Sequence, residues 1–270
     1  MASDEYRSVR QATRVAGPQR RAWLVTLVPA AGIAASEGLL FAGHTEPALW
    51  GHLLVLVGCL VAPLWLTSEI RVFRAFALVS CFRLVNLGMP VFVDLTIYWF
   101  PLIYGPFVPA LYLLARAQEG ISLRLDPAQT LLALPAVLLG SAALAQVEYW
   151  IIRPDALIPT WSLPDVALVT VVMIGFVGLV EELLYRGVLQ RTLVGRYGRW
   201  PGILGASALF GLMHSGYGVA PEILFAATIG VVYGLLYERT DNLALVSVLH
   251  GLMNVFLFAV IPAGPLGSFL

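Results

Sequence analysis

The sequence predicts an all-α protein, a polytopic bundle of about eight to nine transmembrane helices with a cytoplasmic N-terminus. Of the 270 residues, 59% are hydrophobic and only 12% are charged, which is about half the charged share of an ordinary soluble domain. The mean hydropathy is +0.85, and apolar runs recur with roughly the 20 residues that a helix needs to cross the hydrocarbon. This composition excludes a nucleic-acid-binding protein and a cytosolic enzyme.

Nine apolar windows are candidate spans. They are Ala22 to Ala42, Ala48 to Thr67, Val72 to Leu87, Val91 to Ala115, Leu131 to Gln146, Leu163 to Leu184, Pro201 to His214, Pro221 to Tyr237, and Ala244 to Ile261. The third, fifth and seventh windows are short, so eight crossings with one re-entrant or tilted segment also agree with the pattern. Helices are expected because the alternation of barrel strands is absent.

The arginines between the spans predict the orientation. Fourteen of the 16 basic residues, all of them arginine, fall before the first span or in alternate connections. They are Arg7, Arg10, Arg14, Arg20, Arg21, Arg71, Arg74, Arg116, Arg124, Arg186, Arg191, Arg196, Arg199 and Arg239. The positive-inside rule makes their side cytoplasmic. The longest outside loop, Val147 to Ser162, then carries Glu148.

The chain divides into an N-terminal transmembrane region, 1–162, and a C-terminal core, 163–262. Glu37 and Arg83 lie at similar depths in the first and third spans. A charged side chain inside a bilayer costs roughly 2.5–3.5 kcal/mol at the helix centre, so each such residue needs a partner or a purpose. We expect Glu37 and Arg83 to form a structural ion pair between the two helices.

Charged residues also end an apolar run in the C-terminal core. Glu182 and Arg186 are four residues apart, so on a helix they share a face and neutralise each other. Glu181 is rotated from them by about 100° and has no such local partner. A carboxylate near the membrane boundary without a local countercharge is a candidate general base.

Two histidines occur in similar apolar surroundings. His214 follows Phe210 by four residues, and His250 precedes Asn254 by four. This spacing places each pair on one helical face, with Phe210 packed beside His214. If the three helices converge, Glu181 and His214 would activate a water molecule. His250 and Asn254 would then donate to the oxyanion of a tetrahedral intermediate.

The same side chains are also candidate ligands of a divalent metal. Imidazole and carboxylate oxygen bind zinc, and a vacant position would hold a water molecule. The candidate set is Glu181, His214 and His250, assembled across helices. The sequence leaves metal-dependent and metal-free hydrolysis open. Depth is a constraint on either scheme, because His214 lies about 20 Å along its helix whereas Glu181 lies only about 5–10 Å deep. Convergence therefore requires a tilted, lowered or re-entrant seventh span.

These motifs resemble those of the CPBP family of intramembrane proteases, the type II CAAX prenyl endopeptidases and their bacterial relatives. That family is recognised by Glu-Glu-x-x-x-Arg, then Phe-x-x-x-His, then His-x-x-x-Asn, and all three occur here in order. They stand at Glu181 to Arg186, Phe210 to His214, and His250 to Asn254. The resemblance covers roughly Val166 to Phe258, about a third of the chain.

The resemblance implies an endopeptidase that cleaves near the C-terminus of a membrane-associated or prenylated protein or peptide. It implies that Glu181 and His214 activate the water, that His250 and Asn254 stabilise the oxyanion, and that Glu182 and Arg186 support the architecture. The family is described both as metalloprotease and as glutamate-type protease. The expected location is a bacterial cytoplasmic membrane, with the lipid bilayer and the substrate as partners and no nucleic acid.

Two other classes of function remain as alternatives. A non-catalytic membrane scaffold, such as an immunity or partner-binding protein of the same fold, would not require all four polar residues of the site. A transporter would be expected to contain inverted repeats and discontinuous helices, and the sequence has no convincing internal repeat.

Overall fold

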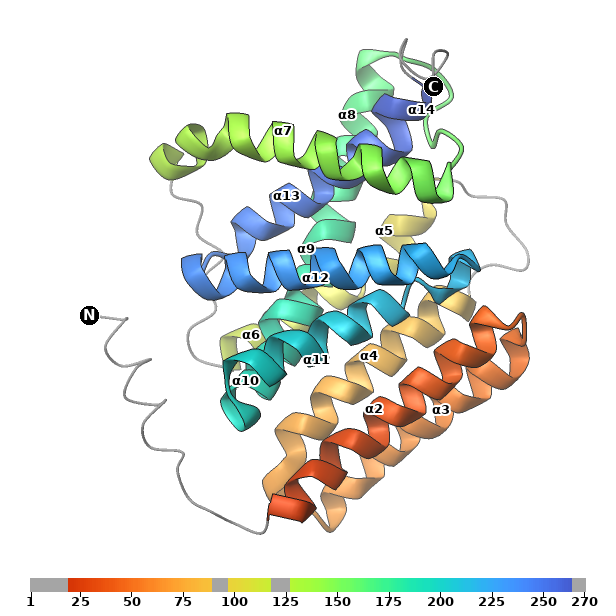
Figure 1. Cartoon of the computed structure of the whole chain (residues 1–270), viewed down its shortest axis with the longest axis vertical. Coiled ribbons are helices and arrows are strands. Elements are labelled where there is room, and N and C mark those ends of the chain that lie inside the picture. Colours follow the sequence, from red (N-terminus) through yellow and green to blue (C-terminus); the bar gives the residue numbers. More distant parts are fainter. Residues whose placement is uncertain (1–18, 89–96, 118–126, 264–270) are drawn as a thin grey trace.

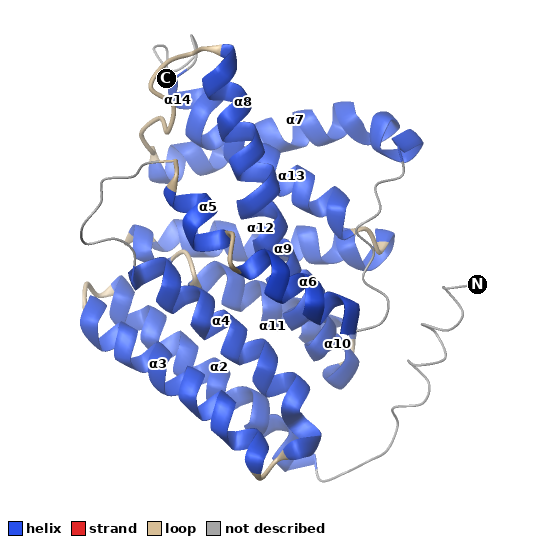
Figure 2. Ribbon diagram, turned by 180° about the vertical axis from the view of Figure 1, so that it is seen from behind, coloured by secondary structure: helices blue, strands red, loops and turns tan. Residues whose placement is uncertain are grey.

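The computed structural model describes residues 19–88, 97–117 and 127–263. All regular secondary structure in these ranges is helical, as predicted (Figure 2). Four of the arginines used for the orientation, Arg7, Arg10, Arg14 and Arg124, lie outside the described residues, as does the start of the fourth predicted span. The cytoplasmic location of the N-terminus stays a prediction.

The N-terminal region consists of three packed helices, two short helices and one long helix (Figure 1). They are α2 (Gln19–Phe41), α3 (Thr45–Val61), α4 (Ile70–Gly88), α5 (Trp99–Tyr104), α6 (Phe107–Ala117) and α7 (Pro127–Ile152). Helix α3 packs against both α2 and α4, and α7 packs against a helix near the C-terminus, α13. Helices α5 and α6 pack against the long helix that begins the C-terminal core.

That long helix runs from residue 163 to residue 197 and contains two widened π-helical stretches. Its parts are α8 (Leu163–Val172), a π segment (Met173–Gly178), α9 (Leu179–Glu182), a second π segment (Leu183–Gln190) and α10 (Arg191–Tyr197). The single turn of α9 carries both Glu181 and Glu182. Such π-helical insertions are frequent at functional sites. The backbone geometry therefore marks the turn of α9 as a candidate functional site.

Three more helices complete the core (Figure 1). They are α11 (Arg199–Leu212), α12 (Ala220–Thr240) and α13 (Leu243–Val255), and a π segment (Phe256–Val260) leads from α13 into α14 (Ile261–Ala263). Helix α11 packs along α12 and α10. Helix α13 packs against α7 on one side and against the π segment before α9 on the other.

Six helices of the described chain are long and apolar enough to cross a membrane. They cover Trp23–Phe41, Thr45–Leu64, Ala133–Ile152, Leu163–Tyr197, Ala220–Thr240 and Leu243–Ala263. The third and seventh predicted spans correspond to α4 and α11, which do not meet this standard, and α5 and α6 break the fourth. The expected count of eight to nine is therefore approximate. The fifth span is longer than expected, because α7 continues through Ile152 and includes Glu148, which the sequence had placed in a loop.

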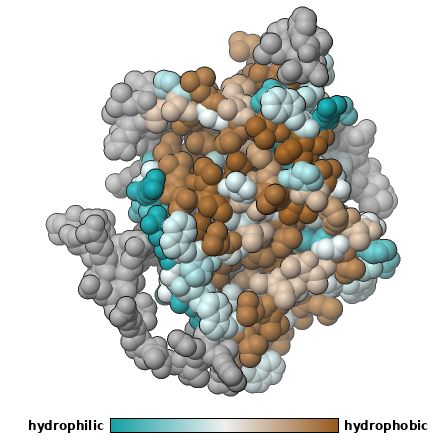
Figure 3. All heavy atoms as spheres, in the orientation of Figure 1, coloured by the Kyte–Doolittle hydropathy of each residue, from teal (hydrophilic) through white to brown (hydrophobic). Residues whose placement is uncertain are grey.

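The outer surface is rich in large apolar side chains (Figure 3). Leu54, Trp65 and Leu139 are each at least 70% exposed. In a water-soluble protein a surface of this kind would promote aggregation. It is the surface that lipid chains cover in a multi-pass membrane protein.

Two glycines bring α13 close to the helix that carries the glutamates. A Cβ atom on Gly251 would lie 2.5 Å from the Cα of Ile174, and one on Gly178 would lie 2.9 Å from the backbone nitrogen of Gly251. Small residues at such crossings let two transmembrane helices approach through their backbones. This contact places His250, the neighbour of Gly251, beside α9.

Candidate active site

Glu182 is the buried anchor of the site. Its side chain is fully buried, and its Oε1 accepts hydrogen bonds from Nη1 of Arg186 at 2.9 Å and from Nδ1 of His250 at 2.8 Å. The ion pair between Glu182 and Arg186 confirms the pairing expected from their spacing. The bond to His250 adds a contact between α9 and α13 and orients the imidazole through one of its nitrogens.

Arg186 connects three helices around this anchor. Its guanidinium lies 4.6 Å from the ring centroid of Phe210 on α11, and its Nη2 donates to the backbone oxygen of Gly230 on α12 at 3.2 Å. A cation held over an aromatic face away from water contributes up to about 2 kcal/mol. These contacts fit the supporting role that the resemblance implies for Arg186 and Glu182.

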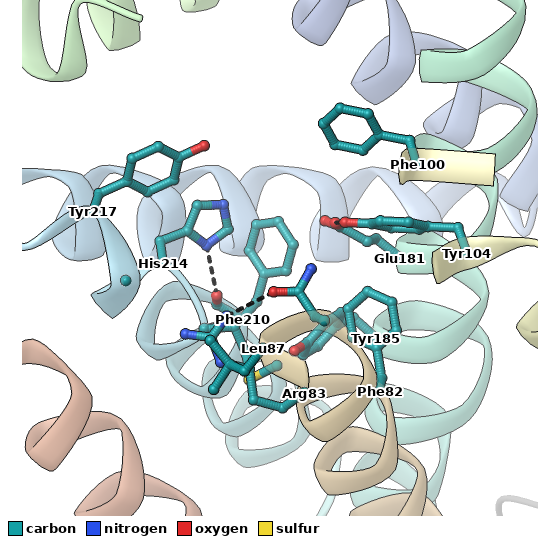
Figure 4. Close-up of a pocket in the computed structure, with 13 residues that line it drawn as sticks. Phe82, Arg83, Leu87, Phe100, Tyr104, Glu181, Tyr185, Phe210, His214 and Tyr217 are labelled. Carbon is teal, nitrogen blue, oxygen red and sulfur yellow. Dashed lines mark hydrogen bonds between the residues drawn. The ribbon is translucent and has the colours of Figure 1, made fainter. Parts of the chain in front are cut away.

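Glu181, unlike Glu182, lines a cavity, and Figure 4 shows its carboxylate beside Tyr104. Its Oε1 accepts a hydrogen bond of 2.6 Å from the hydroxyl of Tyr104 on α5. Its Oε2 lies 3.8 Å from Nε2 of His250. The carboxylate is thus held by the N-terminal region on one side and faces the histidine of α13 on the other.

His214 immediately follows the last turn of α11. Its Nδ1 donates to the backbone oxygen of Phe210 at 3.0 Å, and the two rings lie 5.0 Å apart, which confirms that Phe210 packs beside His214. Because Nδ1 carries the proton of that bond, Nε2 of a neutral imidazole is left as an acceptor. This is the form that a general base requires.

Glu181 and His214 line the same cavity of about 320 Å³ (Figure 4). The two side chains therefore converge, although α11 has the same length, 14 residues, as the predicted seventh span. Residues of the N-terminal region form much of the remaining wall. They are Phe82, Arg83, Asn86, Leu87, Phe100 and Tyr104.

A second, smaller cavity of about 20 Å³ is also lined by His214. His250 and Asn254 line it, and both are buried on α13. His214 therefore borders both cavities. All four residues predicted to carry the chemistry lie at the walls of these two cavities.

The predicted ion pair between Glu37 and Arg83 is confirmed, with Arg83 Nη2 at 2.7 Å from Glu37 Oε2. It belongs to a larger buried network. His52 Nε2 lies 3.1 Å from Glu37 Oε1, and the hydroxyl of Ser215 donates to Glu37 Oε2 at 2.5 Å. Ser215 directly follows His214, so this network ties the turn that carries the histidine to α2, α3 and α4.

The expected metal ligands were Glu181, His214 and His250. Among the described residues no group of three or more His, Cys, Asp or Glu side chains is arranged to hold a metal ion. Nδ1 of His250 is bonded to Glu182 and Nδ1 of His214 to a backbone oxygen, so Nε2 is the nitrogen of each ring left for another partner. The described side chains do not form a metal-binding set in this arrangement.

The fold and the site together define a multi-pass helical membrane protein with a buried carboxylate and histidine site. Residues 163–256 match the model of the family described as type II CAAX prenyl endopeptidase Rce1-like. The match covers α8 to α13 and confirms the resemblance drawn from the three motifs. No curated protein and no solved structure gives a significant match to the chain. At the level of the family, the match implies an intramembrane CAAX-type endopeptidase.

Three polar residues near the site were not predicted. Tyr104 reaches Glu181 across 77 positions of sequence, and no motif marks it. Glu148 was assigned to a loop, and Glu222 is a single acid in the first turn of α12. Both glutamates are buried. Their presence beside or within apolar runs was the available signal, because buried acids in membrane segments are rare and functional.

Proposed function

We propose that this protein is an endopeptidase that hydrolyses a peptide bond near the C-terminus of a prenylated or otherwise membrane-associated protein or peptide. The observation that carries the proposal is the convergence of Glu181, His214, His250 and Asn254 around two adjoining cavities. The family match supports the reaction class, and the exposed apolar surface supports a substrate that is presented from the bilayer.

The first step is the activation of water by Glu181 and His214. Glu181 and His214 line the larger cavity, and His214 also lines the smaller cavity with His250 and Asn254. The scissile carbonyl would therefore bind beside His214, where the two cavities meet. Tyr104 holds one oxygen of Glu181 and leaves the other for the water. General bases positioned in this way contribute typically about 10²–10⁴-fold to the rate.

The second step is the stabilisation of the oxyanion by His250 and Asn254. With Nδ1 of His250 bonded to Glu182, Nε2 donates only when the ring is an imidazolium. Removing a single oxyanion donor in enzymes of this kind costs about 10²–10³-fold in kcat.

The reaction is proposed to proceed without a bound metal. The observation that supports this form is that no three His, Cys, Asp or Glu side chains of the described residues are grouped to hold a metal ion. A chelator should therefore leave the activity unchanged. Loss of activity on chelation, with recovery on addition of zinc, would assign the alternative metalloprotease mechanism.

The test is a cleavage assay with the full-length protein reconstituted in lipid vesicles. The probe is an internally quenched farnesylated peptide that ends in Cys-aliphatic-aliphatic-X, and mass spectrometry identifies the released fragment. Glu181→Ala and His214→Ala should each lose at least about 10²-fold in rate, whereas Glu46→Gln, at an exposed position of α3, should retain it. Equal processing by all variants would contradict the assignment of Glu181 and His214, and absence of cleavage by every protein, the wild type included, would favour a non-catalytic scaffold.

A further inference from the structure

Two buried glutamates outside the family motifs lie beside the smaller cavity. Glu148 on α7 is 6% exposed, and Glu222 in the first turn of α12 is fully buried. The two carboxyl groups lie near enough to interact with each other. Neither glutamate has a role in the reaction described above, and burying two acids in this position is expensive unless they serve a purpose.

The contact between the two carboxyl groups requires a proton. No N–H or O–H group of the described residues donates to either oxygen of Glu222. Two ionised carboxylates in contact repel each other, so a buried pair shares one proton between them. Glu148 and Glu222 are therefore a proton-carrying pair in the interior of the bundle.

Glu148 is the member of the pair that reaches the reaction site. It lines the smaller cavity together with His214, His250 and Asn254, whereas Glu222 does not. The cavity volume of about 20 Å³ is enough for roughly one water molecule. Ser141, two turns before Glu148 on α7, donates to the backbone oxygen of Leu249 at 2.9 Å, which secures α7 against the turn that carries His250.

The hydrolysis scheme must also deliver a proton to the leaving nitrogen, and the smaller cavity places a further acidic group beside His214. An amine leaves a tetrahedral intermediate only when its nitrogen gains a proton. His250 and Asn254 are assigned to the oxyanion, and Tyr104 donates to Glu181. We propose that Glu148 carries the proton that it shares with Glu222 and donates this proton to the leaving nitrogen. The inference rests on the proposed function.

The step balances in atoms and charge. The attacking water loses one proton to His214 as its oxygen bonds to the carbonyl carbon. The electron pair of the breaking carbon–nitrogen bond moves to nitrogen, and that nitrogen takes the proton of Glu148. The proton held by His214 then passes across the smaller cavity to Glu148 and restores the pair.

Several ionisable groups surround Glu148. They are Glu222 on α12, Glu181 on α9, Tyr217 after α11, Tyr233 on α12, and the cavity residues His214 and His250. A pH profile alone would mix their contributions. The leaving group is a more selective probe. An alcohol leaves the intermediate with little help from an acid, whereas an amine needs a proton donor in order to leave.

The experiment compares two farnesylated peptides of the same sequence, one with an amide and one with an ester at the scissile position, in vesicles that contain the full-length protein. Glu148→Gln keeps the size of the side chain and can donate a hydrogen bond to Glu222 but has no proton to transfer. We expect amide cleavage to fall by about 10²-fold or more and ester cleavage to change by less than about threefold. The retained ester cleavage also shows that the variant folds.

Glu148→Asp serves as the matched control, since it restores a carboxyl group at the same position and should recover part of the amide cleavage. Equal loss of both reactions in Glu148→Gln, or no loss of either, would overturn the inference. Wild-type protein that cleaves neither peptide would instead contradict the proposed function itself, so the two failures are distinguishable.

Discussion

Substituting Gly251 by alanine should separate His250 from Glu182, because the added methyl group pushes α13 away from the helix that carries Glu182. The new Cβ would lie 2.5 Å from the Cα of Ile174, whereas carbon atoms in contact sit about 3.5–4.0 Å apart. The helices must therefore separate by about 1 Å at this point. Such a shift stretches the 2.8 Å bond between His250 and Glu182 beyond hydrogen-bonding distance.

The expected loss follows from these distances. A displacement of about 1 Å in a catalytic group costs about 10²-fold in rate, and overpacking of this kind costs about 1–3 kcal/mol in stability. Gly175→Ala is the matched control, because a Cβ there meets no atom within 4 Å. It lies in the helix that faces α13 but outside the contact.

The assay measures kcat for the farnesylated amide peptide in vesicles and the thermal unfolding midpoint of each variant. We expect Gly251→Ala to lose both activity and stability and Gly175→Ala to retain both. A Gly251→Ala protein with the kcat of the wild type would refute the claim that backbone contact between the two helices positions His250 on Glu182.

Other substitutions should distinguish residues that position the catalytic groups from residues that stabilise the fold. Tyr104→Phe removes the hydrogen bond to Glu181 and should lower kcat by about 10-fold or more, since a hydrogen bond to a charged group contributes about 1.5–3 kcal/mol; an unchanged kcat would show that Tyr104 does not position the carboxylate. Glu37→Gln leaves the buried Arg83 without its charge partner and should destabilise the protein by about 3–5 kcal/mol. Thermal unfolding measures that loss, and a double substitution that also replaces Arg83 by methionine should recover much of it. Treatment with a chelator, followed by metal analysis of the purified protein, should leave the cleavage rate unchanged, and a loss reversed by zinc would contradict the metal-free reaction.

The spacing of residues along a helix predicted contacts within that helix, and the need to balance charge predicted one ion pair between helices. The four-residue intervals from Glu182 to Arg186 and from Phe210 to His214 appear as contacts. The need to neutralise charge in a bilayer predicted the pair of Glu37 and Arg83 across 46 positions. In each case an elementary rule of geometry or electrostatics left few alternatives.

Features that arise from packing between distant helices were beyond these rules. The apolar window ends at Gln146, which predicts a loop at Glu148, but the helix continues to Ile152 and packs against α13. The hydrogen bond from Tyr104 to Glu181 depends on the path of a helix 77 positions away. The π segments on either side of α9 also have no marker in hydropathy, so the orientation of Glu181 could not be derived from an ideal helix.

The central claim is that Glu181 acts on the water that cleaves the substrate. The most direct test is kcat for the farnesylated amide peptide with Glu181→Gln and with the exposed control Glu46→Gln, in the same vesicles and with unfolding midpoints to verify folding. We predict that Glu181→Gln folds and loses at least about 10²-fold in kcat, whereas Glu46→Gln is unchanged. A folded Glu181→Gln protein with wild-type kcat would contradict the claim.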